Sequence, residues 1–365
     1  MKEMSDENLF DGVGMVIDDH VFDNLENGDC IVKLVNYLEN DRKIPLVKYD
    51  SLPEFSDMNV LSSIKFLLLD WDLVGITNEE GLGLGNIGQF KENSTKESVR
   101  FLHKITASVV IPIFIFSNDS IDNIKVTLKE EGLWTDEKDG GSHIFIKSKS
   151  DLFCEEKCVM FDVINEWLHS TPSMYVIQKW NISYSQAINS MALDMMTVSA
   201  YWPNILWKCY TVDGVNPSEE ITSVINQNVL SRIQPVEFDK QILGEEKECT
   251  HDVLKNVLGK HCFMEEDKLD ESTSVGDIFK KGGKYYLNIR PACDCVGRDN
   301  KEIEIYLLRG DKIKAGKIKD RYSCKNGNFT EQSNTAIVGP VNELFIEFRF
   351  NDLQIVPYKN GNATA

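Results

Sequence analysis

The sequence lacks a long hydrophobic run. Its longest apolar stretch, Val109–Phe116, is far shorter than the roughly 20 residues that a membrane-spanning helix needs. Met1–Gly14 does not contain the basic segment followed by an apolar segment that marks a secretory signal. We therefore expect a cytoplasmic protein with no membrane partner.

A surplus of positive charge is also lacking. Lysine and arginine together number 39 against 58 aspartate and glutamate residues, which gives a formal net charge of −19. Binding to nucleic-acid phosphates requires a basic surface, and no segment resembles a helix-turn-helix with a basic recognition helix. The charge balance therefore predicts that nucleic acid is not a partner.

The cysteines lack the spacing of a disulfide framework. Nine are scattered along the chain, an odd number that fits a reducing compartment. One group of cysteines and histidines could instead form a zinc site. Its spacings match no paired Cys-x-x-Cys knuckle, so buried thiols are the simpler interpretation. That group consists of Cys249, His251, His261, Cys262, Cys293 and Cys295.

The sequence does contain enough apolar residues for two cores. With 365 residues, 42% of them hydrophobic and 27% charged, the chain is long enough for two domains of ordinary size. The most informative stretch is Phe66–Leu73, an apolar run that ends on Asp70 and continues through Asp72. A short run without polar alternation predicts a strand buried on both faces, as in the parallel sheet of an α/β domain.

Five such segments alternate with helical patterns in the first 170 residues and predict a doubly wound parallel sheet. A capping box at Ser94–Glu97 predicts the start of one helix, and Asp151–Leu168 is predicted to form the last. The predicted strands are Gly14–Asp19, Leu46–Tyr49, Phe66–Asp70, Val109–Phe116 and His143–Ile146.

Polar residues stand where four of these strands end. Asp18 and Asp19 end the first, Asp70 the third, Ser117 the fourth and Lys147 the fifth. In a flavodoxin-like strand order, 2-1-3-4-5, these strands are neighbours, and ligands bind at the carboxyl ends of such strands. We expect the five side chains to meet at one edge of the sheet.

This arrangement resembles the receiver domain of two-component response regulators, over about Val13–Ser170. The resemblance implies that Asp70 accepts a phosphoryl group from a sensor histidine kinase, and that Ser117 and Lys147 bind the phosphoryl oxygens. A hard cation such as Mg²⁺ would neutralise the charge that otherwise repels the attacking carboxylate.

The same resemblance assigns the metal ligands. Asp18 and Asp19 become the metal-side acids, Asp70 contributes as the acceptor, and Asp72 offers its backbone carbonyl. Chemistry of this kind depends on positioning and electrostatics, and the product is a covalent aspartyl phosphate that serves as a signal.

The sequence departs from the receiver pattern in three places. Ser148 stands where the family has proline after the lysine, Ile144 where it has an aromatic residue, and Val74–Asn93 is an insertion. The insertion contains Gly83-x-Gly85-x-x-Gly88, which formally matches a dinucleotide fingerprint but lies about ten residues past its strand. A loop near the acceptor is the simpler interpretation, and the departures suggest that the chemistry is kept while the conformational readout is weakened.

Beyond the receiver region, 13–170, the sequence predicts an α+β module joined by a linker at His169–Ser173. Residues 174–234 are helical and rich in methionine and aromatic side chains, which form either a packed core or a face that binds a partner. Residues 235–358 are mostly strands and turns and predict a small antiparallel β domain.

Three functional classes remain open. The first is a regulator whose phosphorylation controls the contacts of the C-terminal module with a protein partner. The second is a phosphate sink that damps signalling by competing with a second response regulator. The third is an effector enzyme in Met174–Ala365, although no catalytic signature is visible there. The overall arrangement is similar to receiver proteins of bacterial antiphage two-component systems, particularly the non-effector receiver of Detocs-type operons, which favours the sink, a non-enzymatic role in antiviral defence.

Overall fold

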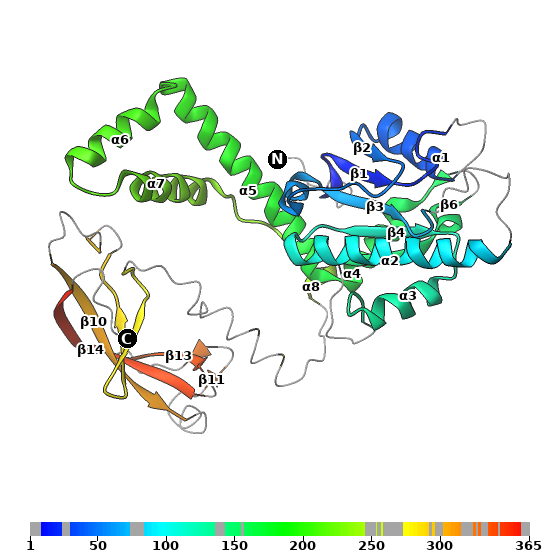
Figure 1. Cartoon of the computed structure of the whole chain (residues 1–365). Helices are drawn as coiled ribbons and strands as arrows, with labels where there is room; N and C mark the ends of the chain where they lie inside the picture. The colour runs from blue at the N-terminus through cyan, green and yellow to red at the C-terminus, as the bar shows by residue number, and fades with distance from the viewer. Residues whose placement is uncertain are drawn as a thin grey trace. The chain divides into compact units, whose positions relative to one another are not determined.

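The architecture was analysed in a computed structural model of the whole chain (Figure 1). Two compact units are present, formed by Met1–Gln186 with Ile233–Glu246 and by Ala187–Arg232 with Lys247–Ala365. The structure describes residues 9–23, 30–73, 84–135, 143–154, 157–244, 253, 257, 273–291, 294–295, 302–314, 324–325, 328–329, 335–341 and 344–358.

The first unit contains a five-stranded sheet in which every strand is parallel to its neighbours, as the apolar runs predict. The spatial order is β2-β1-β3-β4-β5, so the chain moves outward in both directions from β1 and β3. The strands are β1 (Gly14–Ile17), β2 (Leu46–Tyr49), β3 (Phe66–Asp70), β4 (Ile113–Ser117) and β5 (Ile144–Ser148).

Both faces of this sheet are covered, which explains why its strands show no polar alternation. Successive residues of a strand point to opposite faces, so Leu68 and Leu69 belong to different clusters of the core. One face packs against α1 (Cys30–Asn36) and α4 (Met160–Ser170), and the other against α2 (Leu84–Ser108) and α3 (Ile121–Glu130). In Figure 1, α2 is the long helix drawn across the strands.

The face under α1 and α4 is unusually aromatic. Phe114 of β4 is fully buried, with ring centroids 5.8 Å from Phe10, 6.3 Å from Phe66 and 5.4 Å from Trp167. Most of these rings meet edge to face or tilted, the geometries that aromatic quadrupoles favour. The packing fixes β3 and β4 side by side and thereby fixes where their carboxyl ends lie.

Two predicted helix boundaries are wrong. α2 begins at Leu84 rather than at the capping box Ser94–Glu97, which lies inside the helix. The predicted helix 151–168 is instead a short 3₁₀ turn, η5 (Lys149–Leu152), a hairpin of β6 (Phe153–Cys154) and β7 (Lys157–Cys158), and then α4. Phe161 and Ile164 of α4 are buried against the sheet.

The division into units differs from the predicted domains 13–170, 174–234 and 235–358. Only Thr171 separates α4 from α5 (Pro172–Val198), so no linker exists at His169–Ser173. The beginning of α5 belongs to the first unit: Tyr175 is completely buried, and its hydroxyl accepts a hydrogen bond from the Asp239 N–H at 2.9 Å. Asp239 also caps α8 (Lys240–Leu243), which contacts α4.

The helices of the second unit expose much of their apolar surface. They are the end of α5 together with α6 (Trp202–Val212) and α7 (Pro217–Arg232). None of the residues of α6 is buried, and Val229 is the buried residue of α7. The prediction of a packed core for 174–234 is therefore wrong for this part. Large apolar side chains that are more than half exposed are Leu193, Met196, Val198, Tyr201, Ile205, Trp207, Val212 and Leu230.

An antiparallel sheet completes the second unit, as the strand and turn pattern predicts. Its order is β13-β14-β10-β9-β8, and a two-residue turn with positive φ at Gly282 and Gly283 joins β8 to β9. The strands are β8 (Ile278–Lys281), β9 (Lys284–Asn288), β10 (Ile303–Ile313), β13 (Thr335–Val341) and β14 (Leu344–Tyr358), with a separate pair, β11 (Cys324–Lys325) and β12 (Asn328–Phe329).

Among the helices that the structure describes, none combines the length and the apolar character needed to cross a bilayer.

Candidate functional site

Three carboxylates meet at the carboxyl edge of the parallel sheet. Asp70 is the last residue of β3, and Asp18 and Asp19 directly follow β1, its neighbour in the sheet. One side-chain oxygen of each lies within 4.8 Å of the others. Asp18 and Asp70 are buried, with 1% and 6% of their surface exposed, whereas Asp19 is half-buried. The expected convergence of Asp18, Asp19 and Asp70 is therefore present in the structure.

Lys149 supplies the positive charge at this cluster. Its ammonium donates hydrogen bonds to Asp18 Oδ2 at 2.8 Å and to Asp70 Oδ2 at 2.9 Å, and its side chain is 5% exposed. The Cys30 thiol of α1 donates to the Lys149 carbonyl at 3.1 Å, which helps to hold the start of η5 in place. A buried charge of this kind requires a partner of opposite charge, and Lys149 has two.

Lys147, the lysine that the sequence predicts at this edge, is not the one that reaches the carboxylates. The predicted strand ended at Ile146, but β5 continues to Ser148, so Lys147 lies inside the strand and pairs with Phe116. Lys149 is the next lysine along the chain and the first residue after the strand.

A local signal for this strand end does exist in the sequence. Ser148 and Asp151 have the spacing of a cap, and the Ser148 hydroxyl accepts a hydrogen bond from the Ser150 N–H at 3.3 Å at the start of η5. A turn beginning at Ser148 places Lys149, and not Lys147, at the carboxyl edge of the sheet.

Backbone groups satisfy several of the remaining oxygen atoms. Asp18 Oδ1 accepts from the His20 N–H at 3.0 Å, and Asp70 Oδ1 accepts from the Asp72 N–H at 3.3 Å. These hydrogen bonds fix the side-chain torsion angles of Asp18 and Asp70, so that their other oxygens stay directed at the space between the carboxylates. Asp72 therefore contacts Asp70 through its backbone amide, while the expected contact of its carbonyl with a metal stays a prediction.

The cluster fits a hard divalent cation. Asp19 Oδ1 is buried and has no hydrogen-bond partner among the described residues, although the His20 ring lies 3.8 Å away. Three carboxylates against one ammonium leave an excess of negative charge, and oxygen ligands are those that Mg²⁺ prefers. Asp18, Asp19 and Asp70 would hold such an ion, and its charge would offset this excess.

Burial changes the protonation of the cluster. Desolvation is the largest cause and raises the pKa of Asp70 from 3.8 to about 7; the Lys149 ammonium opposes the rise and the Asp18 carboxylate adds to it. Burial likewise raises the pKa of Asp19. For Lys149, burial disfavours the ammonium, but Asp70 and Asp18 outweigh this and raise its pKa above 10.5. Lys149 is therefore charged at neutral pH, while Asp70 exchanges its proton near neutrality.

Ser117 lies at the end of the neighbouring strand and is completely buried. Its hydroxyl oxygen accepts a hydrogen bond from the Asp119 N–H at 2.9 Å, in the turn that leads into α3. A hydroxyl that accepts one hydrogen bond can still donate its own proton. Ser117 therefore lies at the end of the strand next to that of Asp70, and its hydroxyl can donate a hydrogen bond. The hydroxyl oxygen itself is hydrogen-bonded to the turn and not to the carboxylates.

Other predicted features fall partly or wholly outside the described residues. The glycine-rich part of the insertion is not described before Leu84, where α2 begins. Of the proposed zinc ligands, only Cys295 is described; it is buried, and its thiol donates to the Arg290 carbonyl at 3.6 Å. Within the described ranges, Asp18, Asp19 and Asp70 are the one group of side chains placed to hold a metal ion.

Comparisons with known proteins do not assign the chain to a family. No family model, curated protein or solved structure matches it.

Proposed function

We propose that this protein is a receiver that accepts a phosphoryl group on Asp70 from a sensor histidine kinase, with Mg²⁺ bound by Asp18, Asp19 and Asp70. The observation that carries the proposal is the pair of hydrogen bonds from Lys149 to Asp18 and Asp70 beside a third carboxylate. The strand order β2-β1-β3-β4-β5 supports a flavodoxin-like fold of the kind that response regulators have.

The reaction is a phosphoryl transfer between two side chains. An oxygen of the ionised Asp70 carboxylate attacks the phosphorus of a phosphohistidine; the new O–P bond forms as the N–P bond breaks, and the electron pair of that bond returns to the imidazole. Lys149 is placed to donate to the transferred oxygens once the group is on Asp70 Oδ2. Ser117 is the second donor at this edge.

The decisive experiment is phosphotransfer to the full chain. Incubation with a phosphorylated cognate kinase and Mg²⁺ should label the protein with a bond that hydroxylamine cleaves, as expected for an acyl phosphate. Asp70→Asn should abolish labelling, and chelation of the divalent ion should suppress it. Labelling that persisted in Asp70→Asn would show that the acceptor lies elsewhere.

We further propose that the phosphate is stored rather than read out. Assigning the ammonium to Lys149 does not restore the receiver pattern, because Ser150 follows it where proline is expected, and Ile146 stands three residues before it where an aromatic residue is expected. Ile146 is buried in the core under α2 and α3. A site that keeps the acid cluster but lacks the aromatic residue suits a phosphate sink that protects an effector regulator from accidental activation, in bacterial antiviral defence.

A second candidate is a regulator whose second unit binds a protein partner. The exposed apolar side chains of α5, α6 and α7 favour it, since Met196 is 64% exposed and Tyr201 is 73% exposed. The two candidates differ in one outcome. A regulator loses its output when Asp70 is removed, whereas a sink releases the output of another protein.

A further inference from the structure

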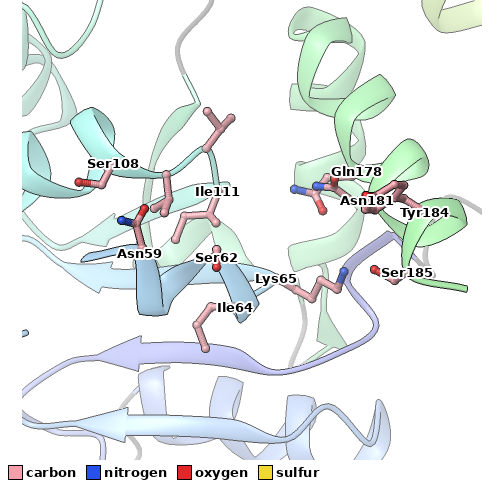
Figure 2. A pocket seen from close by; sticks show the side chains of 12 residues that line it. Asn59, Ser62, Ile64, Lys65, Ser108, Ile111, Gln178, Asn181, Tyr184 and Ser185 are labelled. Atoms are coloured by element: carbon pink, nitrogen blue, oxygen red, sulfur yellow. The ribbon is translucent and has the colours of Figure 1, made fainter. Parts of the chain in front are cut away.

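A second concave site lies at the opposite, amino edge of the parallel sheet. It has a volume of about 350 Å³ and is formed where α5 covers the ends of β3 and β4 (Figure 2). One wall consists of residues that precede these two strands, including Lys65 and Ile111, and the other consists of α5 residues, including Gln178 and Tyr184. All of the residues that line it belong to the first unit.

The pocket is lined by donors and acceptors rather than by acids. Lys65 is the one charged residue of the lining, and no aspartate or glutamate is present. Within the part of the chain that the structure describes, Lys65 forms no ion pair. In a chain with a net charge of −19, a concave surface with a lysine and no carboxylate favours an anionic ligand. The other polar residues of the lining are Asn59, Ser62, Ser108, Gln178, Asn181, Tyr184 and Ser185.

The carboxamide of Gln178 is one polar group that a ligand could meet. This residue is on the second turn of α5 and only 3% exposed, and its side chain makes no hydrogen bond to any residue that the structure describes. Because Gln178 lines the pocket, its amide is available there to water or to a ligand. Figure 2 shows Gln178 and Asn181 on α5 and the side chain of Lys65 extending toward this helix from the segment before β3.

An apolar side of the pocket completes the fit. Ile64, Val109 and Ile111 lie along the sheet edge, and Tyr184 lies on the helix with its ring stacked at 4.8 Å and 15° on Trp180. The stacking holds the Tyr184 ring in one orientation. The volume falls in the range of sites for small molecules, which bind through an apolar surface and a few convergent polar groups.

We propose that this pocket binds a small phosphate monoester, with its phosphate on Lys65 and its hydroxyl or base groups on Gln178 and Asn181. Carboxamides recognise both sugar hydroxyls and the donor and acceptor edges of bases, and lysine recognises phosphate as a point charge. A ribose phosphate and a nucleoside monophosphate share this chemistry, and binding measurements distinguish the two.

The site is independent of the acidic cluster. Lys65 directly precedes β3 and Asp70 ends it, so the two sites are separated by a strand of five residues, about 16 Å at 3.3 Å per residue. A ligand at the amino edge therefore leaves Asp70 accessible. The inference does not depend on the proposed phosphoacceptor function, and Asp70→Asn should bind the ligand as the unchanged protein does.

Isothermal titration of the full chain with adenosine 5′-monophosphate and with ribose 5-phosphate tests the proposal. We expect one of the two to bind in the micromolar to millimolar range, with affinity reduced roughly tenfold to a hundredfold by Lys65→Met. Asn181→Leu should also weaken binding. Lys104→Met, which removes an exposed lysine of α2 outside the pocket, should not change it.

Three results would overturn the proposal. The first is absence of binding by both compounds at millimolar concentration. The second is binding that Lys65→Met leaves unchanged. The third is equal affinity for inorganic phosphate, which would mean that the carboxamides contribute nothing. Thermal unfolding of Lys65→Met and Asn181→Leu establishes that each variant is folded before its affinity is interpreted.

Discussion

Lys149 carries the only positive charge that the described residues bring within ion-pair distance of Asp18 and Asp70. Removing one partner of a buried ion pair leaves the other charges uncompensated, which costs about 3–5 kcal/mol. Lys149→Met should therefore lower the free energy of unfolding by about that amount, as measured by urea denaturation in chelator. It should also slow phosphotransfer to Asp70, because a donor to the transferred oxygens is lost.

Lys147→Met is the matched control. Lys147 is partly exposed on β5 and forms no ion pair with the residues that the structure describes, so its removal should change stability by no more than about 0.5 kcal/mol. Equal losses in the two variants would mean that the ammonium at the acidic cluster has been assigned to the wrong residue.

The raised pKa of Asp70 predicts how stability depends on pH. Between pH 3.8 and about 7 the folded protein holds a proton on Asp70 that the unfolded chain has released, so the free energy of unfolding should fall as pH rises through this window. The accumulated loss for a pKa change of this size is about 4 kcal/mol, and it is complete above pH 7.

Urea denaturation of unchanged protein and Asp70→Asn between pH 4 and pH 8, in chelator, tests this dependence. Asparagine has the shape of the protonated acid and does not titrate, so the variant should lack most of the downward slope. Added Mg²⁺ should flatten the slope of the unchanged protein, because a bound cation stabilises the ionised carboxylate. Parallel curves for the two proteins in chelator would show that Asp70 is not the group that titrates.

At the scale of single elements, strands were easier to predict than the points where they end. β2 and β3 have the predicted boundaries: Lys65 and Asp70 delimit the apolar run of β3, and Pro45 and Asp50 stand on either side of β2. The end of β5 was missed because Lys147 is polar but lies inside the strand, and the start of α2 was missed because Ser94–Glu97 resembles a cap. One strand end misplaced by two residues was enough to select the wrong lysine.

β1 gives a test of how an element positions the site. A Cβ atom at Gly14 would overlap the ring of Phe66, which is 1% exposed, and would lie 2.8 Å from Leu46 Cδ2. The ring of Phe66 is enclosed by the core, so Gly14→Ala should cost about 1–3 kcal/mol through overpacking. Since Asp18 and Asp19 follow the same strand, its displacement should also reduce phosphotransfer to Asp70.

Val13→Ala provides the comparison for that variant. Val13 precedes β1 and is 36% exposed, so shortening it removes two partly buried methyl groups and adds no atoms. Urea denaturation and phosphotransfer assays should show a smaller loss of both properties in Val13→Ala than in Gly14→Ala. A Gly14→Ala protein as stable as Val13→Ala would mean that the aromatic core tolerates movement of β1.

At the scale of the whole molecule, the sequence predicts a parallel α/β domain and an antiparallel β domain, but not the boundary between the two compact units. The start of α5 packs into the first unit through Tyr175, which meets Asp239 and Phe238 more than 60 residues along the chain. A contact between residues so far apart leaves no pattern in the local sequence, whereas a buried strand is visible in the sequence as an apolar run. The pocket beside Lys65 was missed for the same reason, because its two walls come from segments far apart in the sequence.

The role of the whole protein in a pathway is decided by what happens when Asp70 is removed. A phosphate sink takes phosphoryl groups that would otherwise reach an effector regulator, and the aliphatic Ile146 near Lys149 supports this role over a transmitter. Asp70→Ala should therefore leave transfer from the kinase to the effector intact and raise the effector's basal activity, to the point of toxicity in cells. Growth of cells that carry the kinase, the effector and this protein, with and without Asp70→Ala, measures this effect. A transmitter predicts the opposite, because its pathway stays silent without the phosphate; loss of output with the effector still present would therefore replace the sink with the regulator.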